Sequence, residues 1–296
     1  MAKKIIALLC AVLLLLSLCA ACAVQGEFSK QKRINVITRE DGSGTRQAFI
    51  ELFGVEEKGE DGTRRDNTTK DAVTAKQTDI MITNVMNDPY AVGYISVGSM
   101  SDSVKALSIE GVEPSRINVL SGAYEIVRPF YLATKGEASA LAQDFIDFIL
   151  SGLGQAIVAD SGYIPVMEAP VEYQNEAPPA GRLVVAGSSS VTPVMEKLRT
   201  AYREANPAAV IEIQMSDSSG GLLAAMEDTC DIAMSSRDLK ESEQAVLLSV
   251  KIASDAIAVI VNTSNPLEDL ARGQVKDIFT GAALKWNEVI LTEEAE

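Results

Sequence analysis

The strongest constraint on the fold is one stretch, residues 35–53, in which the spacing of apolar side chains changes. Residues 35–38 are rich in β-branched side chains and predict a short strand. A glycine-containing turn follows at residues 41–44. After it, four apolar side chains recur at helical spacing, namely Ala48, Phe49, Leu52 and Phe53. The stretch therefore predicts a strand, a tight turn and the start of a helix.

Such a turn is suited to binding an anion. The first turn of a helix has backbone N–H groups without intrahelical acceptors, and the helix dipole adds partial positive charge there. Ser43 and Thr45 add hydroxyl donors, and Arg39, just before the turn, adds a forked cation. The alternative is that a hydroxyl only caps the helix and that Arg39 is solvated.

The same pattern recurs further along the chain. Residues 183–195 and 210–225 each run from an apolar strand through a serine- and glycine-rich turn into a helix. Residues 231–237 form a shorter apolar run that ends in two serines and an arginine. Four hydroxyl-rich turns, three of them at helix starts, favour one convergent oxyanion site over unrelated helix caps. Strands that alternate with helices indicate the α/β class.

Composition excludes several classes of function. The formal net charge of −15 argues against a nucleic-acid partner, which needs a basic surface. It does not exclude a small anion, because distant charges are screened over about 8–10 Å. The 296 residues contain no histidine, so the sequence excludes Ser-His-Asp and Cys-His catalysis as well as the commonest metal ligand. No cysteine spacing suggests zinc or an iron–sulfur cluster, and we expect neither a metal nor a cofactor.

Residues 1–22 predict a signal peptide. Two lysines precede an apolar run that is too short for a typical transmembrane helix and ends in small residues. The small residues before Cys22 resemble a bacterial lipoprotein signal, although Cys19 stands where that signal usually has leucine. Lipidated Cys22 would be the mature N-terminus, with ordinary secretion or a retained anchor as the alternatives. Residues 23–33 are interpreted as a polar tether, and Cys230 would remain unpaired.

The remaining chain suggests further elements. We expect strands at 80–85, 91–97, 104–109 and 256–261, and an amphipathic helix at 138–150. Residues 167–181 contain three prolines and are interpreted as a surface linker.

A family resemblance rests on the combination of six motifs. It is carried by residues 39–45 (REDGSGT), 187–193 (GSSSVTP), 218–221 (SSGG), 231–236 (DIAMSS), 162–165 (GYIP) and 277–281 (DIFTG) with Trp286. Together they resemble PstS-like phosphate-binding lipoproteins of the phosphate ABC transporter. The resemblance implies a type II periplasmic-binding-protein fold, with two α/β lobes and the ligand between them.

The order of the motifs differs from that family. In relatives the GSSS turn comes first and the DGSGT turn later, whereas here the order is reversed. We interpret this as a circular permutation in which linker 167–181 joins the former termini. One lobe would combine residues 33–103 with 256–296, and the other would be residues 104–255. The chain would cross between lobes at 104–109 and 256–261, where hinge motion would close the cleft.

The resemblance also implies a ligand site and a cellular role. The implied phosphate-binding residues are Arg39, Ser43, Gly44, Thr45, Ser189, Ser190, the N–H of Val191, Ser218 and Ser236. Ser236 stands where some relatives have an aspartate that accepts the proton of hydrogen phosphate, so selectivity over sulfate is the open question. Arg237 would act as a second cation or cover the surface.

The implied function is capture of inorganic phosphate and its delivery to an ABC permease. The protein would be a binding protein and not an enzyme, lipid-anchored on the extracytoplasmic face of the bacterial cell membrane. The alternatives are binding of sulfate or molybdate, a phosphate sensor, or a phosphatase on the same scaffold. A domain-swapped dimer, completed by residues 256–296 of a neighbour, is also compatible with the sequence.

Overall fold

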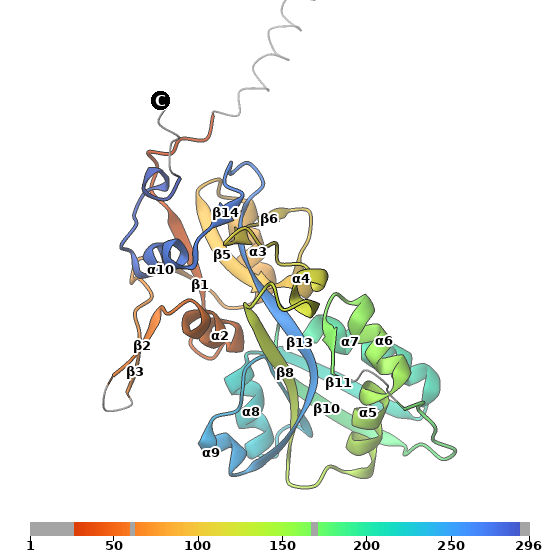
Figure 1. Cartoon of the computed structure of the whole chain (residues 1–296). Helices are drawn as coiled ribbons and strands as arrows, with labels where there is room; N and C mark the ends of the chain where they lie inside the picture. Colours follow the sequence, from red (N-terminus) through yellow and green to blue (C-terminus); the bar gives the residue numbers. More distant parts are fainter. Residues whose placement is uncertain (1–26, 60–62, 167–170, 291–296) are drawn as a thin grey trace, which may run out of the picture.

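The structure is a computed structural model that describes residues 27–59, 63–166 and 171–290. Within them, the chain forms a mixed sheet in the order β11-β10-β12-β8-β13-β5-β1-β4, with β6 and β9 paired to β13 outside this path. The sheet extends through both lobes of the molecule (Figure 1). The predicted α/β class is confirmed.

Lobe A contains both ends of the described chain. Its elements are β1 (Asn35–Arg39), α2 (Gly44–Leu52), β2 (Glu56–Lys58), β3 (Arg64–Asp66), β4 (Val73–Ala75), α3 (Thr78–Met86), β5 (Ala91–Ser96), η1 (Val97–Ser99), β6 (Val104–Ala106), β7 (Ser108–Ile109), α4 (Arg116–Leu120), β14 (Asp269–Leu270), α10 (Arg272–Thr280) and η2 (Trp286–Glu288). The ends meet where the Ile34 N–H donates to the Leu284 carbonyl at 2.9 Å.

Lobe B is formed by the middle of the chain. Its elements are β8 (Val127–Lys135), α5 (Ala140–Leu150), α6 (Gly152–Asp160), β9 (Ile164–Pro165), β10 (Gly181–Ser188), α7 (Thr192–Ala205), β11 (Ala209–Ser216), α8 (Ser218–Met226), β12 (Ile232–Ser235) and α9 (Glu241–Gln244). The long strand β13 (Leu247–Asn262) belongs to both lobes.

Helices cover both faces of the sheet in each lobe. In lobe A, Phe49 of α2 and Phe279 of α10 pack on one face, and Met81 and Val85 of α3 pack on the other. In lobe B, α5, α6 and α7 cover one face through a large apolar cluster, and α8 covers the other. The central strand β5 is accordingly buried on both sides along its whole length, whereas the edge strand β11 has exposed residues.

The crossings between the lobes differ in part from the prediction. Residues 104–109 do not cross: they form β6, which pairs with Ile260–Asn262 of β13, and β7, which pairs with β14. Tyr124 and Ile126 pack in the same lobe A cluster. The chain crosses instead at the start of β8, so the predicted boundary at 103/104 is wrong and lies near 126/127. The second crossing lies in β13, where Ala253 packs in lobe B and Ala256 in lobe A.

The strand predicted at residues 80–85 is also wrong, because this segment lies in helix α3. The flanking strands β4 and β5 both pair with β1 in parallel. Parallel strands need a crossover connection, and α3 provides it. Met81 and Val85, one helical turn apart, are fully buried, whereas Ile80 is exposed.

The described part of the predicted linker, residues 171–180, is held on lobe B. Asp144 of α5 is buried and accepts hydrogen bonds from the Tyr173 hydroxyl (2.9 Å) and from the side-chain amide of Asn175. The Asn206 side-chain amide donates to the Pro179 carbonyl at 2.9 Å. Residues 171–180 therefore form a strap that is held on α5 and the end of α7 by hydrogen bonds.

The predicted signal peptide, Cys22 and residues 23–26 of the predicted tether lie outside the described residues. In the ranges that the structure does describe, no single helix is long and apolar enough to span a membrane. The pair α5–α6, bent by 61°, meets the criteria of length and composition only.

Candidate functional site

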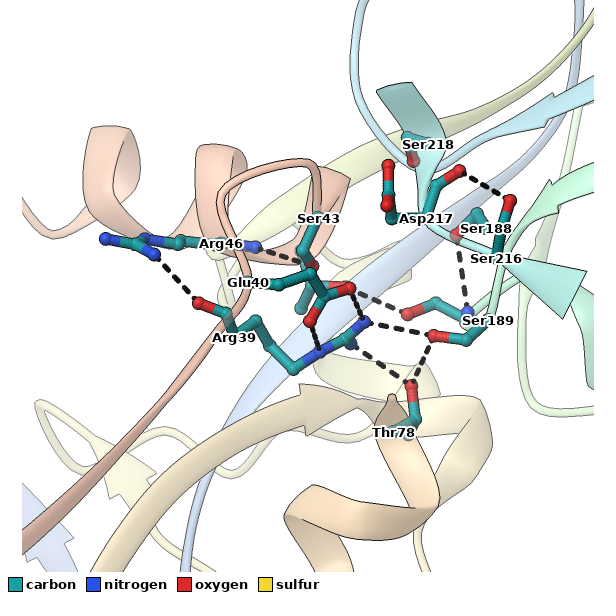
Figure 2. Close-up of polar contacts among 12 residues, drawn as sticks. Arg39, Glu40, Ser43, Arg46, Thr78, Ser188, Ser189, Ser216, Asp217 and Ser218 are labelled. Atoms are coloured by element: carbon teal, nitrogen blue, oxygen red, sulfur yellow. Dashed lines mark hydrogen bonds and ion pairs between the residues drawn. The ribbon is translucent and has the colours of Figure 1, made fainter. Parts of the chain in front are cut away.

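A cluster of buried hydroxyl groups lies where the two lobes meet. We call it the interlobe hydroxyl cluster: Ser43, Thr45 and Thr78 from lobe A, and Ser188, Ser189, Ser190, Ser218 and Ser236 from lobe B. The cluster joins three of the helix-start turns singled out in the sequence to the turn after β12. Figure 2 shows members from both lobes directed toward one another around Arg39.

The helices that begin at the cluster bring their N-termini to it. α2 begins at Gly44, and its cap Ser43 accepts a hydrogen bond from the Arg46 N–H at 3.3 Å. α8 begins at Ser218, and its cap Asp217 accepts from the Gly220 N–H at 2.7 Å. α3 begins at Thr78 without a side-chain cap. Backbone N–H groups in these first turns lack intrahelical acceptors and favour a negative charge beside them.

Arg39 is the cation of the site, and its side chain is 2% exposed. Nη2 donates to Ser189 Oγ across the lobes at 3.1 Å, and Nη1 donates to Thr78 Oγ1 at 3.3 Å. Nε and Nη2 also donate to the two carboxylate oxygens of Glu40, at 2.9 and 2.7 Å. The guanidinium is thus fixed in one orientation by a planar fork and two hydroxyls.

The backbone of Arg39 is held as well. Its N–H donates to the Tyr94 hydroxyl at 3.1 Å, and this hydroxyl also pairs with Thr38 Oγ1 at 2.9 Å. Burial raises the pKa of Tyr94, so the phenol stays neutral at physiological pH. The ring of Tyr94 stacks on Phe49 of α2, with 3.9 Å between ring centroids. The strand and helix on either side of the turn are thereby locked together.

Direct contacts join the two lobes at the cluster. Thr45 Oγ1 and Ser190 Oγ lie 2.9 Å apart, and the Ser219 N–H donates to the Gly42 carbonyl at 3.2 Å. Gly44 allows the closest approach, because a β-carbon there would lie 2.5 Å from Ser218 Oγ and 2.7 Å from Ser236 Oγ. A glycine is therefore required at this point of contact.

The serines of lobe B form a hydrogen-bonded chain. Ser188 Oγ donates to Ser236 Oγ at 2.9 Å, Ser218 and Ser236 Oγ lie 3.2 Å apart, and the Ser236 N–H donates to Ser218 Oγ at 3.0 Å. The turn that presents them depends on Gly187, whose φ of 133° and close approach to Met234 exclude a side chain.

The nine residues implied by the family resemblance lie at or beside this cluster, but they differ in what they offer a ligand. The Val191 N–H donates to the Ser188 carbonyl at 3.0 Å, and its side chain is buried in the lobe B core. Arg237 forms a buried bidentate ion pair with Glu243, and its Nη2 also donates to Ser219 Oγ at 3.0 Å, beside the cluster. Within residues 27–59, 63–166 and 171–290, Arg39 is the one arginine whose guanidinium hydrogen-bonds to hydroxyls of the cluster.

Three residues at the site were not predicted from the sequence. Thr78 was not predicted, because the segment that follows it, residues 80–85, was interpreted as a strand, whereas Thr78 is the first residue of helix α3. Glu40 follows Arg39 directly, and nothing in the sequence indicated that its carboxylate turns back onto the guanidinium. Ser188 is the first serine of the triplet at 188–190 and could have been included on that ground.

The arrangement can bind a tetrahedral anion, since it combines a fixed cation, several hydroxyls and helix N-termini. Among the residues that the structure describes, no group of three or more carboxylate or thiol side chains is placed to hold a metal ion.

Comparisons with known proteins agree with this description. The model of the PBP superfamily domain matches residues 16–152 and 173–295. Phosphate-binding protein PstS 2 of Streptococcus agalactiae is 46% identical over 272 residues, which are 91% of this chain and 92% of the relative. The crystal structure of a phosphate-binding protein of a phosphate ABC transporter from Streptococcus pneumoniae superposes with a TM-score of 0.69. It is 42% identical, and the match covers 87% of this chain and 99% of that one.

A further relative matches over only part of its length. Phosphate-binding protein PstS of Bacillus subtilis is 35% identical over 146 residues, which are 48% of this chain and 45% of the relative.

Proposed function

Since the chain belongs to the PstS family of phosphate-binding proteins within the PBP superfamily, we propose that it captures inorganic phosphate between its lobes and delivers it to an ABC permease. The observation that carries this proposal is the contact between Arg39 of lobe A and Ser189 of lobe B, inside a buried cluster of hydroxyls. A ligand held by both sides of this contact would keep the lobes together, as a transport protein requires.

The assigned ligand residues follow from donor chemistry. The Arg39 guanidinium offers N–H donors to phosphate oxygens, and Ser43, Thr45, Ser189, Ser190, Ser218 and Ser236 offer hydroxyl protons. Ser43 can cap α2 and still donate, because the cap uses its oxygen as acceptor. Gly44 contributes close backbone approach and an N–H in the first turn of α2. Val191 is the weakest member of this set, because its N–H already has an acceptor.

Selectivity for phosphate over sulfate needs a hydrogen-bond acceptor for the phosphate proton. Ser236 lacks the charge that would repel a fully deprotonated dianion. The carboxylate of Glu40 contacts Arg39 and is 18% exposed, so it lies at the site with the required charge. If the Glu40 carboxylate does not accept the phosphate proton, binding of sulfate or molybdate is the alternative.

Binding without turnover is the proposed activity. Histidine is absent from the whole sequence, so a phosphatase on this scaffold would need another general base. The relatives named above are described as phosphate-binding proteins. Incubation with a chromogenic phosphate ester tests the point, because turnover above background would contradict pure binding.

The proposal includes an extracytoplasmic location with a lipid anchor at Cys22. Its support is the basic and apolar N-terminal segment and the small residues before this cysteine. Metabolic labelling with a fatty acid should label the wild type and not the Cys22→Ala variant. Labelling that persists in this variant would contradict the anchor.

We also retain circular permutation as part of the proposal. The two ends of the described chain adjoin in lobe A, where residues 33 and 285 form an antiparallel bridge. Since PstS 2 of S. agalactiae aligns over 91% of this chain, its segments follow the same order. The match to the B. subtilis protein spans about half of each chain, as a linear alignment of permuted sequences would.

Calorimetric titration of the ligand-stripped protein with phosphate, sulfate and molybdate is the experiment that tests the function. One-to-one phosphate binding without a sulfate signal is the expected result. Binding of sulfate or molybdate in preference to phosphate would change the substrate and keep the site. A folded protein that binds none of the three would overturn the transport proposal.

A further inference from the structure

A second buried polar cluster lies next to the interlobe hydroxyl cluster, where β8 and β13 run side by side from one lobe to the other (Figure 1). We call it the hinge cluster and define it as Ser96, Arg128, Tyr163 and Asp255, all of which are buried. Arg128 and Asp255 are partners in the β8–β13 register. Arg128 Nε and Nη2 donate to Asp255 Oδ2 at 3.0 and 2.9 Å.

Two contacts join the hinge cluster to lobe A, one of them made by its own member Ser96. Ser96, the last residue of β5, donates from Oγ to Asp255 Oδ1 at 2.8 Å. Gly98 of η1 packs against Tyr163, since a β-carbon at Gly98 would lie 2.2 Å from the tyrosine ring. Any change in the angle between the lobes must therefore move the surroundings of Asp255 and Tyr163.

The hinge cluster also contacts two of the serine turns of lobe B through their backbone. Arg128 Nη1 donates to the carbonyl of Ser236 at 3.3 Å. The Tyr163 hydroxyl donates to the carbonyl of Ser190 at 3.4 Å. Ser190 and Ser236 are two of the lobe B serines whose side chains face lobe A in the interlobe hydroxyl cluster. Each of these two hydrogen bonds thus fixes the backbone of one turn whose serine side chain faces lobe A.

The electrostatics of the hinge cluster are those of a buried ion pair. Burial lowers the pKa of Arg128 and raises the pKa of Asp255, and the attraction between the two charges opposes both shifts. The charge of Arg39 also acts on Arg128, so the two guanidiniums lie within electrostatic reach. Removal of the Arg128 or the Asp255 side chain alone would leave the other charge buried and uncompensated, which strongly destabilises the fold.

We propose that Arg128 and Tyr163 are positioning residues for the anion site, which couple the angle between the lobes to the placement of Ser236 and Ser190. This inference rests on the proposed function, because it concerns the affinity of that site for phosphate. The coupling depends on the geometry of the Arg128 hydrogen bonds and not on its charge alone. A lysine at position 128 would keep the charge but lose the planar fork that bonds to Asp255 and to the Ser236 carbonyl at the same time.

Tyr163→Phe is the most direct test, because it removes only a hydroxyl. The matched control is Tyr202→Phe, a fully buried tyrosine in the same lobe B core whose hydroxyl bonds to Asp144 and Asn206, away from the site. The full-length protein in detergent is titrated with inorganic phosphate, and its thermal unfolding is measured without ligand. Tyr163→Phe should weaken phosphate binding about 3- to 10-fold, whereas Tyr202→Phe should lower Tm and leave Kd unchanged.

A double-mutant cycle separates positioning from general destabilisation. In the Ser190→Ala background, the effect of Tyr163→Phe on phosphate affinity should shrink to less than about half, because the supported hydroxyl is already absent. Additive effects of the two substitutions would contradict the inference. Arg128→Lys should weaken phosphate binding about as much as Tyr163→Phe, and wild-type affinity in that variant would overturn the role of the fork.

The two proposals fail in different ways. Wild-type protein that binds no phosphate would refute the proposed function before any variant is made. Wild-type protein that binds phosphate, with Tyr163→Phe equal to Tyr202→Phe in Kd, would retain the function and refute the positioning role.

Discussion

Arg39 in lobe A donates a hydrogen bond from Nη2 to Ser189 Oγ in lobe B, across 150 positions of sequence, at 3.1 Å. Both side chains are buried, and Thr78 bonds to both of them. This contact joins the strand end of β1 to the turn after β10. Because an anion bound at Arg39 would also reach Ser189, the contact links ligand binding directly to the approach of the lobes (Figure 2).

Substitution of Arg39 should weaken anion binding without unfolding the protein. Arg39→Lys keeps the charge but loses the fork to Glu40, Thr78 and Ser189, and we expect phosphate affinity to fall about 10- to 150-fold. Calorimetry measures the change. The control is Arg182→Ala, an exposed arginine whose ion pair with Glu212 lies at the surface, and it should bind as the wild type does. Equal affinity in both variants would mean that the site lies elsewhere.

A side chain at Gly44 should keep the lobes apart. The β-carbon of Gly44→Ala would overlap Ser218 Oγ and Ser236 Oγ, and overpacking of this kind costs about 1–3 kcal/mol. Phosphate affinity should fall by about 5- to 150-fold, while Tm without ligand changes little. Gly273→Ala is the control, because its β-carbon would meet no atom within 4 Å. Unchanged affinity of Gly44→Ala would show that this close approach is dispensable for binding.

Neutralisation of Glu40 should change selectivity. Glu40→Gln removes the carboxylate that contacts Arg39, and with it the charge that repels a bare dianion. We expect sulfate affinity to rise at least about 5-fold relative to phosphate affinity, in competition experiments at pH 7. Asp41→Asn removes the same charge one residue away, at a side chain that is 97% exposed. If both variants shift selectivity equally, the effect is one of general charge and not of Glu40.

Release of the strap at residues 171–180 should reduce stability. Asp144→Ala leaves the buried hydroxyl of Tyr202 and the linker residues Tyr173 and Asn175 without their acceptor. The free energy of unfolding should fall by about 1–3 kcal/mol, measured by urea denaturation. Limited proteolysis should begin within residues 171–180. Asp147→Ala, at an exposed position on the same helix, should show neither effect.

The local sequence pattern was sufficient to predict the hydroxyl-rich turns. The turns at 41–44 and 187–190 combine glycine with hydroxyl side chains just before an apolar helical face, and this combination depends only on neighbours in sequence. The serines and Arg39 could therefore be named as site candidates before any fold was known. Local pattern also predicted the strand at 256–261, where six apolar residues in a row form the second half of β13.

Local pattern was misleading where pairing partners decide the structure. Residues 104–109 look like one strand, but β6 and β7 pair with different partners of lobe A, so the crossing moves to β8. The segment that begins at Thr78 is short and apolar, and its periodicity alone does not separate a strand from a buried helix. It forms helix α3 because it connects β4 to β5, which are both parallel to β1, and this helix places Thr78 at the site.

The sequence by itself determined the α/β class, the hydroxyl-rich turns and the family, because these depend on local spacing and on residue types. Only the tertiary structure decided which cations serve the site. Arg39 and Arg237 each flank a hydroxyl-rich turn and each pairs with a glutamate, Glu40 and Glu243 respectively. Of the two, Arg39 also bonds across the lobes to Ser189. The physical reason is that a guanidinium bonds to whichever acceptors lie within about 3 Å, and long-range folding chooses those acceptors.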